Sequence, residues 1–270
     1  MVTFKFTSAR NLRLVGLGAL SAAMAWIAPV GAQAAPSPKP ACLLSAAGLD
    51  ASLVRTREAL QEGRPLTIVA IGSSSTFGAG ASTVAASYPS RLEALLKERF
   101  PGAAIRVINR GVNGEEEADM LARFGRDVIA EKPDLVLWQV GANAVVRGRP
   151  MAQEEALIRQ GIERLKATGA DVALIDIQYT PEVVAKTGAR PMVSLIAAEG
   201  RRQDVGVFHR FEMMKEWREN ARMPFQAFSS PDGLHMNDWG YDCFARNLAA
   251  AIVETAAPPV MASVPAASVH

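Results

Sequence analysis

The sequence predicts an α/β fold, a three-layer α/β/α sandwich built around a parallel sheet of roughly five strands. Two observations lead to this prediction. Short apolar, β-branched runs, which are typical of strands covered on both faces, recur along the chain. Longer stretches with helical periodicity separate them, and strands that alternate with helices form parallel sheets. No internal repeat interrupts this alternation.

The order of the expected strands and helices indicates which edge of the sheet binds ligands. The strands are expected at Leu66–Ile71, Ile105–Asn109, Leu135–Val140, Val172–Ile177 and Asp204–Phe208. The helices are expected at Tyr88–Phe100, Glu115–Ala130, Ala152–Thr168, Met192–Arg202, Phe211–Asn220 and Asp238–Glu254. Because crossovers between parallel strands are right-handed, the carboxyl ends of all strands meet at one edge, where such sheets bind ligands.

The two ends of the chain have compositions that differ from that of the domain. A basic start precedes an apolar segment at 14–28, and an Ala-x-Ala site follows, which is typical of a secretory signal peptide at 1–34. The segment is shorter than the ~20 apolar residues of a spanning helix, so export with cleavage is favoured over a membrane anchor. We therefore expect a periplasmic or secreted protein with a linker at 35–41, a domain at 42–256 and a disordered tail at 257–270.

Composition argues against several classes of function. The formal net charge is +2 and no basic cluster marks a face for nucleic acid. Three histidines and two distant cysteines do not fit the usual zinc sites. The glycine-rich stretch 71–80 lacks both the P-loop lysine and the dinucleotide-binding glycine pattern. No metal and no cofactor are expected, and no later segment is apolar enough to span a membrane.

Cys42 and Cys243 are the two cysteines of the chain, and both follow the predicted leader. In an oxidising compartment such a pair is typical of a disulfide. A bridge would pin the start of the domain onto its last helix and close a loop of roughly 200 residues, which contributes at most about 4–5 kcal/mol to stability. Two buried free thiols are the alternative that the sequence leaves open.

Glycine-bearing polar turns follow the first three strands, at 72–76, 111–114 and 141–143, and the predicted topology brings them to one edge. A serine nucleophile there needs a base and a third group that orients the base. Asp232 and His235, three residues apart in a turn, offer both. The competing interpretation is an aspartate that caps a turn beside an ordinary surface histidine.

Four blocks of the sequence, in this order, resemble the SGNH (GDSL-type) hydrolase family and cover most of the domain. They are Gly72-Ser73-Ser74-Ser75-Thr76, Asn109-Arg110-Gly111-Val112-Asn113-Gly114, Gly141-Ala142-Asn143-Ala144 and Asp232-Gly233-Leu234-His235. The resemblance implies a flavodoxin-like fold in which Ser74 is the nucleophile, His235 the base and Asp232 its orienting partner.

The resemblance also implies an oxyanion hole. Its donors would be the backbone N–H groups of Ser74 and Gly114 and the side-chain amide of Asn143, with Gly111 as the alternative to Gly114. Asn109 is expected to hold the second turn by hydrogen bonding.

Two positions depart from the family pattern. Ser73 stands where the family usually has Asp, and Ala144 replaces the Asp that commonly supports the turn after the asparagine. Neither Asp belongs to the triad, so the catalytic roles survive both changes.

The substrate is the part of the function that the sequence defines least. Asp176, Gln178, Tyr179 and Ser73 are expected to contact it, and the stretch Thr180–Arg202 is expected to form a partial lid. Hydrolysis of a carboxylic ester through an acyl-enzyme is predicted, with O-acetyl groups on a carbohydrate as the favoured substrate. The alternatives are a lysophospholipase or short-chain arylesterase, an acyltransferase and a non-catalytic glycan-binding module.

Overall fold

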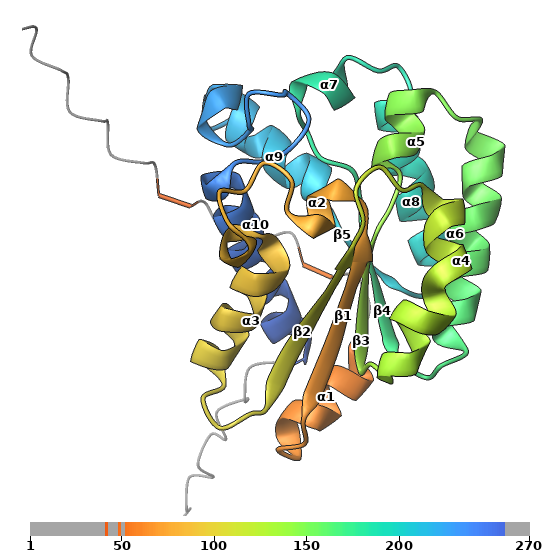
Figure 1. The fold of residues 1–270 in the computed structure, drawn as a ribbon, viewed down its shortest axis with the longest axis vertical. Coiled ribbons are helices and arrows are strands. Elements are labelled where there is room, and N and C mark those ends of the chain that lie inside the picture. Colours follow the sequence, from red (N-terminus) through yellow and green to blue (C-terminus); the bar gives the residue numbers. More distant parts are fainter. Residues whose placement is uncertain (1–40, 43–47, 50–51, 257–270) are drawn as a thin grey trace, which may run out of the picture. The chain divides into compact units, whose positions relative to one another are not determined.

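The computed structural model of the chain describes residues 41–42, 48–49 and 52–256. The predicted signal peptide at 1–34, all of the linker except residue 41, and the tail at 257–270 lie outside the described residues. Within the described part, strands and helices alternate along the domain (Figure 1). No helix among these residues has the length and apolar character needed to cross a membrane.

The strands of the described domain form one parallel sheet in the order β2-β1-β3-β4-β5 (Figure 1). Their bounds are β1 Leu66–Gly72, β2 Ile105–Gly111, β3 Leu135–Gln139, β4 Asp171–Ile175 and β5 Gly206–Phe208. Gly72 and Gly111 are partners in the register of β1 and β2, so the turns after these strands begin at the same level. The predicted fold class is confirmed.

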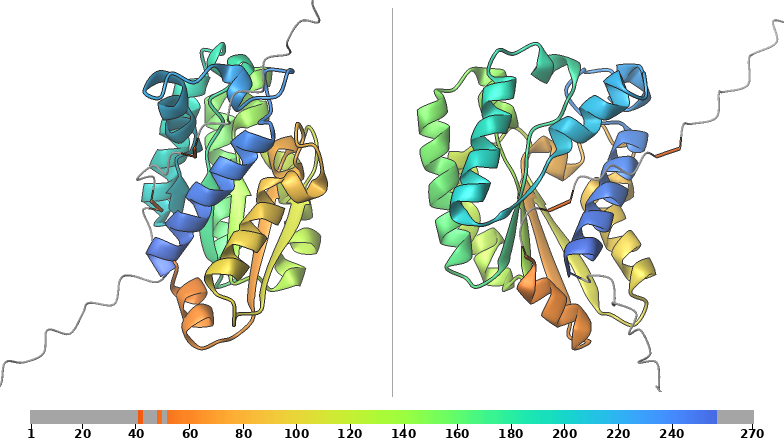
Figure 2. Two further views of the ribbon diagram at one scale, coloured as in Figure 1. Left: turned by 90° about the vertical axis from the view of Figure 1, so that its left-hand side faces the viewer. Right: turned by 180° about the vertical axis from the view of Figure 1, so that it is seen from behind.

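Helices cover both faces of this sheet, as Figures 1 and 2 show. One face carries α1 Val54–Gln61, α3 Tyr88–Arg99 and α10 Asp238–Ala256, and the other carries α4 Glu117–Asp127, α6 Met151–Lys166 and α8 Ala189–Gln203. The other helices among the described residues are α2 Ser74–Phe77, α5 Ala142–Arg147, α7 Pro181–Val184, α9 Arg210–Glu219 and the short 3₁₀ turns η1 Val84–Ala86, η2 Ile129–Glu131 and η3 Phe225–Ala227.

The strands inside the sheet, β1, β3 and β4, are nearly continuous apolar runs because their alternate side chains enter different cores. In β1, Ile68 and Ala70 pack with α3 and α10, whereas Val69 and Ile71 pack with α4 and α6. All four are fully buried. A strand covered on both faces places no residue in solvent, which is why polar residues are missing from its interior.

Several helix boundaries differ from the predicted ones, for local reasons. The helix expected from Glu115 begins at Glu117, because Glu116 is its N-cap and forms a capping box with Asp119. Helices α2, α5 and α7 were not predicted from the sequence, since four to six residues are too few to show a helical period. Helix α1 was also missed, and its buried residues are only Thr56 and Ala59.

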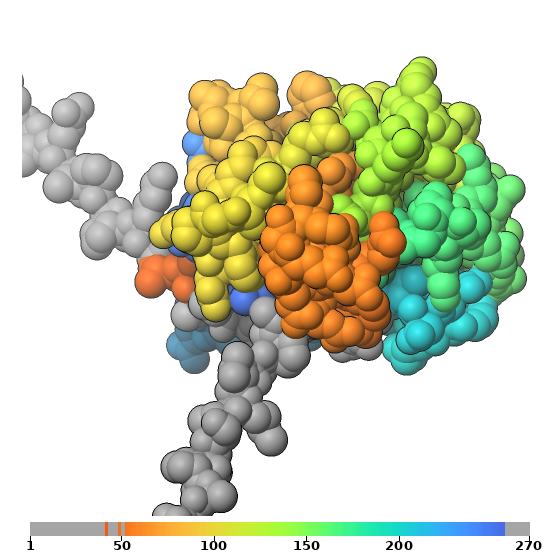
Figure 3. Space-filling view, turned by 90° about the horizontal axis from the view of Figure 1, so that it is seen from below, coloured from red at the N-terminus to blue at the C-terminus, as the bar shows by residue number. Residues whose placement is uncertain are grey.

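Helix α1 closes the end of the sheet that lies opposite the predicted site. The backbone N–H and the hydroxyl of Thr56 both donate to Asp171 Oδ2 at 2.8 Å, at the start of β4. Figure 3 shows α1 (orange) across the middle of this face of the molecule. The amino ends of the central strands are therefore covered, and the carboxyl ends are left for ligands.

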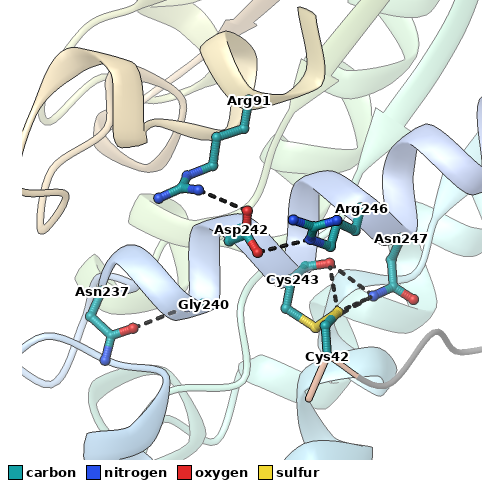
Figure 4. The surroundings of a disulfide bond; sticks show 8 residues. All are labelled: Cys42, Arg91, Asn237, Gly240, Asp242, Cys243, Arg246 and Asn247. Atoms are coloured by element: carbon teal, nitrogen blue, oxygen red, sulfur yellow. Dashed lines mark hydrogen bonds and ion pairs between the residues drawn. A yellow bond between two sulfur atoms is a disulfide. The ribbon is translucent and has the colours of Figure 1, made fainter. Parts of the chain in front are cut away.

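The predicted disulfide is confirmed, because Cys42 and Cys243 are bonded with their Cα atoms 5.3 Å apart (Figure 4). It joins the start of the domain to α10. In the same region Asp242 of α10 accepts from Arg91 of α3 at 2.7 Å and from Arg246 at 2.8 Å (Figure 4). The last helix is thus held to the start of the domain by the disulfide and to α3 by the Arg91–Asp242 ion pair.

Candidate active site

Ser74, His235 and Asp232 form one hydrogen-bonded row. His235 Nε2 lies 2.7 Å from Ser74 Oγ, and His235 Nδ1 lies 2.6 Å from Asp232 Oδ2. Ser74 and His235 are 161 residues apart in the sequence, so the fold rather than local spacing brings them together. The predicted triad residues are therefore in hydrogen-bond contact in the order that a serine nucleophile requires.

Glycines at the ends of two adjacent strands allow the chain to turn sharply into the helix that carries Ser74. A Cβ on Gly72 would lie 2.2 Å from Thr76 Oγ1, and one on Gly111 would lie 2.0 Å from the Phe77 nitrogen. Helix α2 therefore rests directly on the backbone of β1 and β2. This contact fixes Ser74, which is only half-buried, at the first position of α2.

Ser73, which was expected to contact the substrate, is buried and hydrogen-bonds to Gln139, a residue for which no role was predicted. Its N–H and its hydroxyl donate to Gln139 Oε1 at 3.0 and 3.1 Å, and the Thr76 hydroxyl donates to the same oxygen at 3.3 Å. Gln139 ends β3. The available signal was a single polar residue at the end of the apolar run Leu135–Val140.

The Asp232 carboxylate is surrounded by donors from its own turn. Oδ1 accepts from the Ser230 hydroxyl at 2.6 Å and from the N–H groups of Leu234 and His235 at 2.9 and 3.0 Å. Burial acts to raise the pKa of this carboxyl, but the hydrogen bonds from His235, Ser230 and Leu234 together outweigh it. The pKa of Asp232 therefore lies well below its usual range, and the group stays ionised beside His235.

Gln178, expected to line the substrate pocket, lies behind the turn that carries Asp232 and His235. Its Nε2 donates to the carbonyl oxygen of Leu234 at 3.2 Å, and its Oε1 accepts from Arg210 Nη2 at 2.9 Å. The Thr180 hydroxyl donates to the same carbonyl at 3.1 Å. Gln178 and Arg210 are both buried, so these contacts brace the turn from inside the protein.

The other residues predicted near β4 have separate surroundings. Tyr179 is partly buried and its hydroxyl donates to Glu219 at 2.9 Å. Asp176 is fully buried, which raises the pKa of its carboxyl, and accepts from the Phe211 N–H at 2.8 Å. Of the expected lid, α8 packs against the sheet, whereas α7 adjoins the turn that carries Asp232 and His235 through a 2.9 Å hydrogen bond from the Glu182 N–H to the Gly233 carbonyl.

The three turns predicted to supply oxyanion donors follow β2, β1 and β3, which are neighbours in the sheet. Ser74 therefore lies between the turn of Gly114 and the turn of Asn143. The Gly111 N–H donates to Asn109 Oδ1 at 2.9 Å, as expected for an asparagine that holds this turn. That contact occupies the Gly111 donor and favours Gly114, which has a φ of +79° in the left-handed region.

Contacts between the turn after β2 and the turn after β3 tie the two sides of this region together. Asn143 Nδ2 donates to the Glu115 carbonyl at 2.7 Å. Arg147 Nη2 donates to the Gly114 carbonyl at 2.9 Å, and the Arg147 guanidinium also pairs with Glu116. Asn143 and Gly114 are thus held relative to each other by residues of both turns.

The chain matches a family of known proteins over most of its length. Residues 39–258, most of the chain, match the family described as the Non-GDSL lipase-like family. The chain belongs to this family, and the predicted resemblance to SGNH (GDSL-type) hydrolases is confirmed.

The chain also matches curated relatives over parts of their length. It is 36% identical over 90 residues to Esterase TesA of Pseudomonas aeruginosa, a match that covers 33% of this chain and 45% of TesA. It is 42% identical over 60 residues to an acetylxylan esterase of Geobacillus stearothermophilus, covering 22% of this chain and 27% of that protein. An arylesterase of Vibrio mimicus is 34% identical over 95 residues, covering 35% and 46%. Each match spans less than half of the relative.

Solved structures share the fold at low identity. Axe2, an acetylxylan esterase from Geobacillus stearothermophilus, has a TM-score of 0.59 and 20% identity over 69% of this chain and 94% of Axe2. A two-domain esterase (CEX) active on acetylated mannans has a TM-score of 0.64 and 20% identity over 82% of this chain and 60% of that protein.

Proposed function

We propose that this protein is a serine esterase that hydrolyses carboxylic esters through an acyl-enzyme. The observation that carries the proposal is the row of hydrogen bonds from Ser74 Oγ through His235 to Asp232, at 2.7 and 2.6 Å. The esterases and the arylesterase to which the chain is similar support the same chemistry. Solved variants of Axe2 described as catalytic mutants change a serine, a histidine and an aspartate, the same three residue types.

The proposed reaction begins when Ser74 Oγ attacks the ester carbonyl and His235 Nε2 takes the hydroxyl proton. The Asp232 carboxylate accepts the hydrogen bond from Nδ1–H and stabilises the imidazolium. The negative charge that forms on the carbonyl oxygen is met by three donors, the N–H groups of Ser74 and Gly114 and the Asn143 amide. Each such donor is worth about 10²–10³ in kcat.

Collapse of this intermediate breaks the ester bond, and the alcohol leaves with the proton that His235 had taken. Ser74 then carries the acyl group. A water molecule attacks the carbonyl carbon of that acyl group while His235 takes a proton from the water, and a second oxyanion forms in the same site. When this intermediate collapses, His235 returns the proton to Ser74 Oγ and the carboxylic acid is released.

For the substrate we favour an O-acetyl group on a carbohydrate. Several similar proteins are named for acetylated xylan or mannan, which supports this choice. Phe77 lies three residues after Ser74 on α2 and is 51% exposed, so an apolar aromatic ring is available beside the nucleophile.

A short-chain arylesterase is the second candidate, since the arylesterase match favours it. Action on a polysaccharide is consistent with export, for which the N-terminal leader and the disulfide are the arguments.

The test compares acetylated xylan and mannan oligosaccharides with aryl acetates and with longer-chain esters. Ser74→Ala serves as the blank and Ser194→Ala, on the exposed face of α8, as the matched control. We expect acetate release by the wild type and by Ser194→Ala but not by Ser74→Ala, with fluorophosphonate labelling that depends on Ser74. If the wild type is not labelled and releases no acid from any ester, the protein is not a serine esterase.

A further inference from the structure

A pair of buried carboxyl groups that the proposed mechanism does not use lies next to the Asn143 turn. Glu117 of α4 is 2% exposed and Glu154 of α6 is 1% exposed. Their side chains are within hydrogen-bond reach of each other. Among the described residues, neither Oε2 atom has a hydrogen-bond donor. Two carboxylates in contact away from water cannot both be ionised, so a proton between them is the arrangement that satisfies both groups.

This pair is attached directly to the turn. Glu117 Oε1 accepts from the Gly141 N–H at 2.5 Å, a charge-assisted hydrogen bond when the pair keeps one negative charge. Gly141 has a φ of +88°, and a Cβ there would lie 2.7 Å from Met192 Cγ. The turn therefore has little freedom to move at Gly141.

The segment at the start of α4 also contacts the turn at Asn143. Asn143 follows Gly141 by two residues, and its Nδ2 donates to the carbonyl of Glu115 at 2.7 Å. The residues that begin α4 thus contact the turn at both ends, through the Glu117 side chain and the Glu115 backbone. A shift of Glu117 would be transmitted to the Asn143 amide.

The residue that follows Asn143 supplies no carboxylate to this turn. Ala144 is fully buried and stands where SGNH hydrolases commonly carry an aspartate that supports the turn. This chain has no carboxylate at that position. The carboxyl oxygen that contacts the turn belongs instead to Glu117 of α4, and Glu154 of α6 contacts Glu117.

We propose that Glu117 and Glu154 are positioning residues that share one proton and, as a singly charged pair, hold the Gly141–Asn143 turn so that the Asn143 amide faces the oxyanion. The inference rests on the proposed ester hydrolysis, in which Asn143 is a donor. It assigns no contact with substrate to either glutamate.

The charges around the pair indicate when the proton is lost. Burial and contact with Glu117 raise the pKa of Glu154 to about 8, Glu116 adds to this effect, and Arg149, in the loop before α6, opposes it. Above this pKa, two negative charges face each other, and the repulsion displaces Glu117 from Gly141.

The experiment measures kcat and KM for aryl acetate hydrolysis from about pH 7 to about pH 10. In the wild type we expect kcat to fall through this range while KM stays constant, because only transition-state stabilisation is lost. Glu154→Gln, which cannot ionise, removes this alkaline fall. Glu163→Gln, at an exposed position of the same helix, keeps it.

A second pair of variants separates the positioning role from folding. Glu117→Ala removes the acceptor of the Gly141 N–H and lowers kcat about 10–100-fold at constant KM, less than the full loss of an oxyanion donor. Glu117→Gln keeps an acceptor oxygen and restores most of that loss. The proposal is overturned if Glu117→Ala retains wild-type kcat, or if Glu154→Gln and Glu163→Gln show the same alkaline fall as the wild type.

The shared proton has a readout that does not depend on activity. A protonated buried carboxyl gives an infrared C=O band that we expect near neutral pH in the wild type and in Glu163→Gln, and not in Glu154→Gln. Absence of the band in the wild type overturns the inference. Presence of the band in a wild type that hydrolyses no ester would instead refute the proposed function and leave the shared proton established.

Discussion

Ser73 and Gln139 are joined by two hydrogen bonds, from the Ser73 N–H and hydroxyl to Gln139 Oε1 at 3.0 and 3.1 Å. They belong to the ends of β1 and β3, which are paired in the sheet. The position before Ser74, usually an aspartate in SGNH hydrolases, is therefore neutral here and faces a neutral amide. This pairing keeps the turn that carries Ser74 attached to the sheet without placing a charge beside it.

Replacing Gln139 by Leu is expected to destabilise the protein by about 1–3 kcal/mol, because the buried donors of Ser73 and Thr76 lose their acceptor. Urea unfolding measures the change. Gln153→Leu, at an exposed position of α6, is the matched control and should alter stability by less than about 0.5 kcal/mol. Equal effects of the two substitutions would show that the Gln139 contacts contribute nothing.

Replacing Gln178 by Ala is expected to lower kcat and leave KM nearly unchanged. Its amide braces the Leu234 carbonyl from behind, so its loss loosens the turn that aligns His235. Initial-rate kinetics over a range of ester concentrations separate the two parameters. A rise in KM at constant kcat would instead place Gln178 in contact with substrate, as the sequence analysis expected. Tyr179→Phe, which removes only the hydroxyl that donates to Glu219, is the neighbouring control.

Replacing Asp232 by Asn is expected to lower kcat by up to about 10⁴, as in other triads in which the carboxylate is lost. Steady-state kinetics measure it, and a loss below about tenfold would contradict the assigned role. Asp204→Asn is a suitable control, since Asp204 is exposed and its φ of +53° suits asparagine.

The stability of the wild type at acid pH depends on the same carboxylate. The pKa of Asp232 is lower in the fold than its value of about 3.9 in an unfolded chain. Its contribution to stability is therefore complete above that value and is lost as the pH falls through the folded pKa. Between neutral pH and about pH 5 we expect no loss of stability from Asp232 in chemical unfolding measured across this range, and a decline that Asp232→Asn abolishes would show otherwise.

Reduction of the Cys42–Cys243 bond is expected to raise the intact mass by two hydrogens and to lower the free energy of unfolding by up to about 4–5 kcal/mol. Urea unfolding with and without dithiothreitol measures the difference. The variant with both cysteines replaced by serine should be insensitive to the reductant. Unchanged wild-type mass on reduction would show that the bond does not form.

The sequence predicted the sheet because burial on both faces makes the strands inside it, β1, β3 and β4, nearly continuous apolar runs, while the edge strand β2 keeps an exposed Arg106. Ile68–Ile71 is such a run, and its four side chains fill two cores. Ser74, Asp232 and His235 could also be predicted, since a short motif marks each turn and the topology of a parallel sheet brings the turns to one edge. Contacts that depend on the direction in which a side chain points could not be predicted from motifs and topology.

Gln139 and Gln178 illustrate this limit. Both stand at the carboxyl end of a strand region, and the sequence does not say whether such a side chain points into the site or into the protein. The Glu117–Glu154 pair left no signal for a different reason. Each glutamate lies in the first turn of a helix, where acidic residues are common, and only the packing of α4 against α6 makes them neighbours.

The bond between Cys42 and Cys243 turns the chain between them into a covalent ring, and Ser74, Asp232 and His235 all lie on that ring. One cut of the backbone anywhere along it opens the circle but leaves both pieces on the same molecule. Ser74 and His235 then remain tethered even when a protease has cut the chain between them. The protein divides in two only when a second covalent bond, in the backbone or between the sulfurs, is also broken.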